Sequence, residues 1–230
     1  MPRVNLKKET FNVMKRRFAL KNMGMAFGYA AATPTLLSIL QSCKEKAPYA
    51  EWTPTFFDKD KGYALAQMID VILPRTDTPS ATEVNVHVFI DQFVNEVLPG
   101  EQQNFTVTLL DKFMGKVLSE SGKNDLMDVE AGDFEPLLNT YLAKQTDDQQ
   151  KAQEEAIAAY MESTMKGEEA ELDEEVACYV FAENVRNMAI WAYKSSEYVG
   201  EEVLAYLPIP GEYVGCGDLN ELTGGKAWSL

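Results

Sequence analysis

The stretch Leu65-Ala-Gln-Met-Ile-Asp-Val-Ile-Leu-Pro-Arg-Thr-Asp-Thr-Pro-Ser-Ala81 holds a helix and the turn that stops it. Its apolar residues recur at helical spacing and share one face, which carries Leu65, Met68, Ile69, Ile72 and Leu73. Pro74 ends the helix because it has no amide hydrogen to donate. The turn motif after it comprises Pro74, Thr76, Asp77, Thr78 and Pro79. Its Asp and Thr oxygens can accept bonds from local amides, so we expect a rigid turn.

The rest of the chain repeats this pattern of an apolar face followed by a Pro or Gly break. We expect a second helix at about 83–98, and a third that carries the stripe Leu110, Phe113, Met114, Val117 and Leu118 before Gly122. A fourth opens with Asp133 as its N-cap, and a fifth runs from caps at Asp147 and Asp148 to about Met165. The sixth carries Ala177, Phe181, Val185, Met188 and Ala192. Without any convincing strand pair, the sequence predicts an all-α fold, a single bundle of five to six helices.

The composition changes from Ser196 onward. This segment, 196–230, holds six of the 14 glycines, and its Leu207-Pro-Ile-Pro-Gly211 run cannot continue a helix. It is too aromatic for a disordered tail. We therefore expect an extended Gly/Pro/aromatic C-terminal arm that lies on the domain's own surface or on a partner. Its candidate partner contacts are Tyr206, Pro208, Pro210, Gly211, Tyr213, Gly215, Cys216 and Trp228.

The amino terminus has the pattern of a secretory leader. A basic run precedes an uncharged, mildly apolar segment, Asn22–Leu40, and small residues follow it. The basic run resembles the twin-arginine signal that exports folded proteins, with Arg16, Arg17, Phe18 and Lys21 as the signal residues. The sequence Leu40-Gln-Ser-Cys43 resembles a bacterial lipobox, in which the cysteine is acylated. We expect export through the twin-arginine translocase and a lipid anchor at Cys43, on the periplasmic side of the inner or outer membrane.

Two other interpretations of the leader remain open. Paired arginines also occur in an ordinary positive n-region, and Asn22–Leu40 is about long enough to remain as an uncleaved membrane span. Three consecutive alanines, two glycines and the Thr-Pro-Thr break at 33–35 make it weakly apolar for a span. The expected organisation is therefore a signal peptide at 1–42, a linker at 43–55 and a helical domain at 56–230.

The charge balance limits the partners that the domain can have. The chain has 21 basic and 36 acidic residues, and the leader holds seven of the basic ones but only one acidic one, so the part from Cys43 onward has a net charge of −21. Such a surface repels phosphate backbones, which excludes nucleic-acid binding. It also does not adhere to an anionic bilayer, which leaves an acyl group as the expected membrane contact.

The three cysteines suggest no metal or redox site, because none has a Cys-x-x-Cys neighbour. If Cys43 is acylated, Cys178 and Cys216 remain in an oxidising compartment. A disulfide between these two cysteines and a reduced, buried Cys178 are both open.

The sequence offers no catalytic constellation. His87 is the only histidine, and Glu83, His87 and Asp91 follow one another at four-residue spacing, as metal ligands on one helix would. A dimetal bundle needs matching Glu-x-x-His pairs on other helices, so we expect a polar helix face here rather than a metal site. No Gly-x-Ser-x-Gly nucleophile motif is present, and Gly215-x-Gly217 lacks the strand and helix of a dinucleotide site. We expect no catalytic, metal or cofactor site in this chain.

Two segments resemble one known family. Met68–Ala81 with Val86-His-Val-Phe-Ile-Asp91 looks like the start of the gluconate 2-dehydrogenase subunit 3 family, the gamma or small subunit. Ser80 stands where that family usually has Gly, which makes the turn slightly less permissive. The end, Tyr206-Leu-Pro-Ile-Pro-Gly-Glu-Tyr-Val-Gly-Cys216 with Gly225-Lys-Ala-Trp-Ser229, is similar to that family too. Lys226 stands where Arg would be expected.

The resemblance implies an accessory subunit without a cofactor of its own. The implied partner is a large flavoprotein of the glucose-methanol-choline oxidoreductase type, which binds FAD in the cytoplasm and often lacks a leader. The small subunit would supply the export signal for both chains and hold the complex near an electron acceptor such as a cytochrome. Two alternatives stay open: a stand-alone helical lipoprotein that binds a ligand or scaffolds an envelope complex, and an enzyme in its own right.

Overall fold

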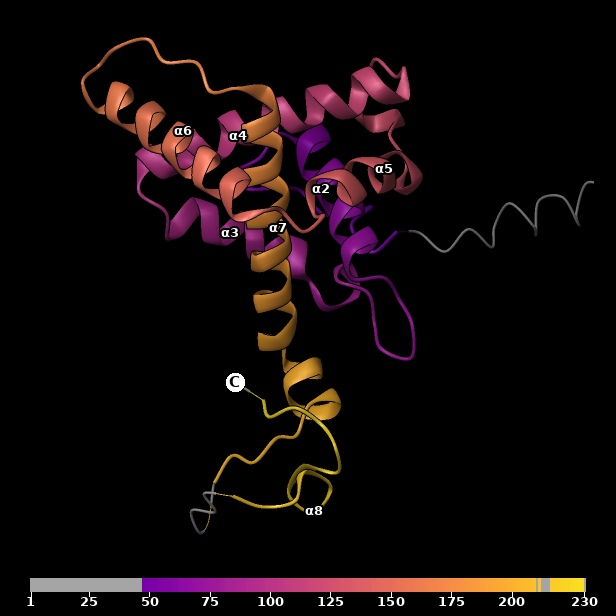
Figure 1. The fold of residues 1–230 in the computed structure, drawn as a ribbon. Helices are drawn as coiled ribbons and strands as arrows, with labels where there is room; N and C mark the ends of the chain where they lie inside the picture. Colours follow the sequence, from indigo (N-terminus) through magenta and orange to yellow (C-terminus); the bar gives the residue numbers. More distant parts are fainter. Residues whose placement is uncertain (1–46, 210, 212–215, 230) are drawn as a thin grey trace, which may run out of the picture. The chain divides into compact units, whose positions relative to one another are not determined.

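The computed structural model describes residues 47–209, 211 and 216–229, and the regular structure in this part of the chain is helical. The α-helices are α2 (Lys59–Ile72), α3 (Val86–Glu96), α4 (Gly100–Ser121), α5 (Ala131–Tyr141), α6 (Asp147–Met165), α7 (Glu174–Ser195) and the short α8 (Leu219–Thr223), shown in Figure 1. Two 3-10 turns, η1 (Thr82–Val84) and η2 (Leu126–Asp128), and a π-helical turn, η3 (Val199–Val203), complete them. These elements belong to one unit, Pro48–Leu230. The all-α prediction is confirmed.

Helix α7 is the central element of this unit. It contacts α2, α3, α4, α5 and α6, and in Figure 1 it continues towards the C-terminal segment. The Phe113 ring of α4 lies 5.0 Å from the Phe181 ring of α7 and 6.2 Å from the Tyr141 ring of α5. Phe113 is fully buried, so these aromatic contacts join α4, α5 and α7 in one core.

The predicted apolar faces of α2, α4 and α7 are confirmed. Leu65, Met68 and Ile69 of α2 are at most 1% exposed, and α2 ends at Ile72, just before Pro74. Helix α4 ends at Ser121, and Gly122 follows in the left-handed conformation that commonly terminates helices. The spacing of the apolar residues therefore predicts these helices, because burial repeats with the helical period.

The second predicted helix is wrong at its start. Thr82–Val84 forms the separate turn η1, and Asn85 has a φ of 60°, which breaks the helix before Val86. Glu83 thus does not share a helix with His87 and Asp91. The expected polar face is also wrong, because His87 and Asp91 are 1% and 0% exposed.

Two predicted helix caps are displaced by a few residues. Glu130 is the N-cap of α5, and Asp133, the predicted cap, lies three residues inside and accepts a 2.7 Å hydrogen bond from the Glu130 amide. Thr146, rather than Asp147 or Asp148, caps α6 and accepts a hydrogen bond from the Gln149 amide. In both cases the acidic residues occupy the first helical turn, where their negative charge interacts favourably with the positive end of the helix dipole.

The described part of the predicted linker is packed on the helices. The Tyr63 hydroxyl donates to the carbonyls of Ala50 and Trp52, at 3.1 and 2.9 Å, and the Trp52 ring stacks on the Tyr63 ring. A Cβ at Gly62 would lie 2.5 Å from Pro54 Cγ, so only glycine allows this approach. Residues 49–55 are therefore part of the domain and not a free spacer.

The predicted export-signal residues Arg16, Arg17, Phe18 and Lys21 and the predicted lipidation site Cys43 lie outside the described residues. Among the helices that are described, none is both long and apolar enough to cross a bilayer.

Candidate functional site

The turn motif Pro74–Pro79 is ordered by hydrogen bonds at its base and its tip. The Ala81 amide donates to the Leu73 carbonyl at 3.0 Å, which closes the loop between α2 and η1. At the tip, the Thr76 amide donates to the Thr78 carbonyl at 2.9 Å, and the Thr78 amide donates to Thr76 Oγ1 at 3.4 Å. The two threonines therefore make the predicted local bonds, whereas no bond to the Asp77 carboxylate occurs within the described part of the chain.

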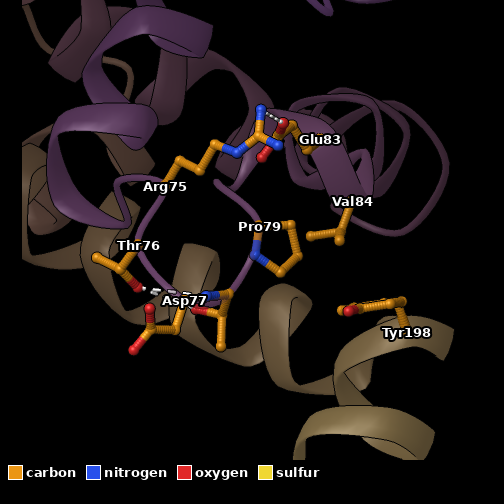
Figure 2. A pocket seen from close by; sticks show the side chains of 8 residues that line it. Arg75, Thr76, Asp77, Pro79, Glu83, Val84 and Tyr198 are labelled. Carbon is orange, nitrogen blue, oxygen red and sulfur yellow. Dashed lines mark hydrogen bonds and ion pairs between the residues drawn. The ribbon is translucent and has the colours of Figure 1, made fainter.

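Two carboxylates hold the turn from its flanks. Glu83 pairs with Arg75 at 2.9 Å and accepts the Ser80 amide at 2.7 Å, as Figure 2 shows for the ion pair. Asp70 of α2 accepts both the amide and the hydroxyl of Thr82, at 2.8 and 2.6 Å. Ser80 lies outside the left-handed region, since Asn85 is the sole non-glycine residue with positive φ among those described. Serine therefore fits at position 80 without backbone strain.

The turn meets the end of α7, which lies far away in the sequence. The Tyr193 hydroxyl donates to the Pro79 carbonyl at 2.8 Å. Tyr198, just beyond α7, lines a cavity of about 370 Å³ together with Arg75, Pro79 and Val84, and Figure 2 shows its ring facing Val84. The structure thus brings the turn motif and the start of the predicted arm together.

Beyond this contact the predicted arm is not extended throughout. It begins with η3, and then Ala205 and Trp228 form a β-bridge that closes the chain between them into a loop. The Ala205 amide donates to the Ala227 carbonyl at 2.8 Å, and the Ser229 amide donates to the Ala205 carbonyl at 2.9 Å. Lys226, in the place of the expected Arg, donates to the Glu202 carbonyl at 3.3 Å.

This C-terminal loop exposes large apolar side chains. They define what we call the loop patch, and their exposed fractions are Tyr206 49%, Leu207 51%, Ile209 82%, Leu219 58%, Leu222 42% and Trp228 49%. Such a concentration on one short segment is typical of a protein interaction site, because isolated chains rarely leave so much apolar surface in water.

The candidate arm residues divide into three groups. Tyr206 and Trp228 belong to the loop patch, and Pro208, Gly211 and Cys216 are exposed beside it. Pro210, Tyr213 and Gly215 lie outside the described residues. As candidate contacts, sequence reasoning missed Leu207, Ile209, Leu219 and Leu222. For the last two a signal was present, because an Asp218 N-cap followed by two leucines three residues apart predicts a helix.

Both described cysteines are free thiols, so Cys178 and Cys216 do not pair. Cys178 is buried in α7, and that burial raises the pKa of its thiol to about 11. The thiol therefore stays protonated and unreactive at neutral pH. This is the buried, reduced form that the sequence left open.

His87 and Asp91 have a structural role on α3. The Asp91 carboxylate accepts the amides of Thr55, Phe56 and Phe57 at 2.6, 3.0 and 3.1 Å, and we call this arrangement the Asp91 clamp. His87 packs edge-on against Trp52 at 4.8 Å. Its burial lowers the pKa to about 4, although the nearby Asp91 charge acts in the opposite direction. A neutral, buried imidazole cannot reach a substrate, and its Nδ1 has no partner within the described structure.

The residues that the structure describes contain no group of three His, Cys, Asp or Glu side chains that could hold a metal ion. Glu83, the first member of the spaced triplet, points instead to Arg75 and Ser80. The arrangement offers an ordered turn and an apolar loop, both suited to contact with another protein.

Comparison with known families gives one match. The model of the family described as gluconate 2-dehydrogenase subunit 3 matches residues 59–211, from the first residue of α2 into the C-terminal loop. Searches against curated proteins and against solved structures gave no match. Because the family match covers more than half of the chain, this protein belongs to the gluconate 2-dehydrogenase subunit 3 family.

Proposed function

We propose that this chain is the accessory subunit of an FAD-dependent dehydrogenase, and that it binds the catalytic flavoprotein through its C-terminal loop. The partner is a glucose-methanol-choline type oxidoreductase acting on a sugar, sugar acid or other alcohol, and the FAD belongs to that partner. The observation that carries the proposal is the loop patch, whose six side chains are 42–82% exposed. In a subunit of a dehydrogenase complex, we expect a second protein chain to bury this surface in an interface.

The bonds at the base of the loop favour its use as a binding element. The bridge between Ala205 and Trp228 holds the two ends of the loop together. The loop therefore loses less conformational entropy when the partner binds. A hollow of about 520 Å³ next to Tyr198 is lined by Glu83, Glu197, Glu201 and Glu202. We therefore expect a partner surface with an apolar centre and basic residues at its edge.

The proposal extends to export and anchoring. The leader at 1–42 would take both folded chains through the twin-arginine translocase, and acylated Cys43 would hold them on the periplasmic side of the membrane. An electron acceptor such as a cytochrome would be met there. The support is the pattern of Arg16, Arg17, Phe18 and Lys21 and of the Leu40–Cys43 lipobox.

A pull-down from the native host tests the partner. Wild-type chain should recover a yellow flavoprotein in equal amount. Ile209→Asp combined with Leu219→Asp places two charges in the loop patch and should lower the recovery at least tenfold. Met165→Asp is the matched control, because Met165 is 77% exposed and Ile209 is 82% exposed, yet Met165 lies at the end of α6.

The outcomes separate the parts of the proposal. Equal recovery by the double variant and the wild type would remove the loop from the interface. Recovery of a clean monomer without flavoprotein would overturn the proposed function and leave the stand-alone lipoprotein. Circular dichroism of both variants should match the wild type, because all three substituted side chains are exposed.

A further inference from the structure

A second apolar surface lies between α3, α4, α6 and α7, away from the C-terminal loop. It is a groove of about 570 Å³, and its walls include Phe93, Leu98, Phe105, Met161, Met188 and Trp191. Pockets that bury small organic ligands have volumes of roughly 300–1,000 Å³ and mostly apolar walls. The groove therefore has the size and character of a ligand site.

The lining of the groove carries no charge among the residues that the structure describes. Its polar members are Gln102, Thr106, Asn184 and Asn187, whose amide and hydroxyl groups can each bond a neutral oxygen or nitrogen. In a chain with 25% charged residues, an uncharged wall of this size selects against ions. A charged ligand would lose its hydration here without an opposite charge to replace it.

One end of the groove is aromatic. The rings of Phe89 and Phe93 lie 5.9 Å apart, and the Trp191 ring lies 5.0 Å from Phe89 and 5.6 Å from Phe93, nearly perpendicular to both. Trp191 is nevertheless 45% exposed, so part of its surface is left for a further contact. Phe93 and Trp191 line the groove, and offset or edge-on packing against these two rings favours a ligand that itself carries a flat ring.

The α6 wall of the groove can adjust. None of the described side chains of α6 is buried, and the helix reaches the groove through Met161, while Tyr160 packs on Phe105 at 5.7 Å. Methionine side chains fill irregular spaces because they are unbranched and polarisable. A loosely held helix with a methionine contact can admit a ligand without disturbing the α4–α7 core.

We propose that this groove binds an uncharged, mainly apolar small molecule that contains an aromatic ring. A protein segment fits less well, because stable protein interfaces bury about 1,000 Å² or more and need a broad apolar surround. The α7 side of the groove instead carries the polar, exposed side chains of Asn184 and Asn187. The inference does not depend on the proposed flavoprotein partner.

Titration of the full chain with N-phenyl-1-naphthylamine, a neutral dye that fluoresces in apolar sites, tests this site. The wild type should show saturable binding, and the sulfonated analogue 8-anilinonaphthalene-1-sulfonate should bind at least tenfold more weakly. Thr106→Phe fills the groove from α4 and should weaken binding of the neutral dye at least tenfold. Asn184→Phe, which fills it from the exposed rim of α7, should do the same.

Thr108→Phe is the matched control. Thr106 and Thr108 lie two positions apart on α4 and so on different faces of the helix. Each hydroxyl donates to the carbonyl four residues before it, at 2.8 and 2.9 Å. Only Thr106 lines the groove, so Thr108→Phe should leave the affinity within twofold of the wild type. Absence of saturable binding to the wild type, or equal affinity of the wild type and both filling variants, would overturn the proposal.

Discussion

The carboxylate of Asp91 accepts hydrogen bonds from three successive amides of a segment that lies more than thirty positions earlier in the chain. Bonds to a charged acceptor are among the stronger ones in proteins, and an amide left without its partner costs further free energy. Asp91 is completely buried, so its carboxylate is shielded from bulk solvent. The side chain therefore joins residues 55–57 to α3.

Asp91→Ala should lower the free energy of unfolding by about 2–4 kcal/mol, because three amides lose their acceptor. Urea unfolding followed by circular dichroism measures this difference. Asp77→Ala is the control, since Asp77 is exposed on the turn, and its effect should stay within about 0.5 kcal/mol. Equal stabilities of the two variants would contradict the structural role of the clamp.

His87 should make stability depend on pH in the mildly acidic range. Its folded-state pKa is about 4, below the ordinary value of 6.5, because burial disfavours the charged ring. Between these values the unfolded chain binds the proton and the folded chain does not, so the free energy of unfolding rises with pH. The contribution of His87 is complete above about pH 6.5, and roughly 2 kcal/mol of it is lost by pH 4.5.

Urea unfolding at pH 7 and at pH 4.5 checks this expectation. Carboxylates also titrate in this range, so the informative quantity is the difference between wild type and His87→Gln. The wild type should lose roughly 2 kcal/mol more than the variant on acidification. Parallel loss in both proteins would show that the His87 proton is not coupled to folding.

Helix α6 should open more readily than the other long helices. None of its described residues is buried, whereas α7 buries seven. Helices are stabilised mainly by tertiary packing, so α6 amides should exchange with solvent hydrogen well before those of α4 and α7. Thr146→Ala removes the N-cap and should speed this exchange severalfold, corresponding to about 1 kcal/mol.

Hydrogen exchange read out by mass spectrometry measures the α6 amides directly. Thr164→Ala provides the comparison, because Thr164 lies in the last turn of the same helix and its hydroxyl bonds only the Tyr160 carbonyl. That variant should leave exchange near the wild-type rate. Protection of α6 equal to that of α7 would contradict the loose attachment.

The helices with a regular apolar face were predictable from sequence, and the contacts between distant segments were not. Spacing alone predicts α2, α4 and α7, because burial repeats with the helical period. The predicted start of α3 was wrong because Asn85 adopts the left-handed conformation, which asparagine tolerates but does not require. The burial of Asp91 was missed because its amide partners at 55–57 are far away in sequence.

In the candidate site, too, local features were predictable from sequence and contacts between distant segments were not. Proline, threonine and aspartate in succession predict an ordered turn at 74–79, as found. The approach of Tyr193 to Pro79 spans 114 positions and leaves no local signal. The arm was predicted as extended because Pro and Gly exclude a long helix, but the pairing of Ala205 with Trp228 depends on two residues 23 positions apart.

At the scale of the whole molecule, the leader should determine the location of two proteins. If the proposed export function is right, replacing Arg16 and Arg17 together with Lys should leave both this chain and the proposed flavoprotein partner in the cytoplasm, because a twin-arginine signal is read by residue type and not by charge. Cell fractionation with antibodies to both chains measures this. Lys15→Arg changes the neighbouring basic residue at constant charge and should leave export intact; export of the partner by the double variant would contradict the carrier function.

The bridge between Ala205 and Trp228 also makes the C-terminal loop a separable module. The loop joins the helical domain through η3 and Ala205, and the bridge to Trp228 is parallel, so the chain comes back beside Ala205 running in the same direction. Such a segment can be appended to the end of a helix in an unrelated carrier, with η3 as its attachment, but it does not fit into an antiparallel hairpin. Binding of the proposed partner would then be transferred with the loop. The helical domain would serve to connect the loop to the proposed export signal.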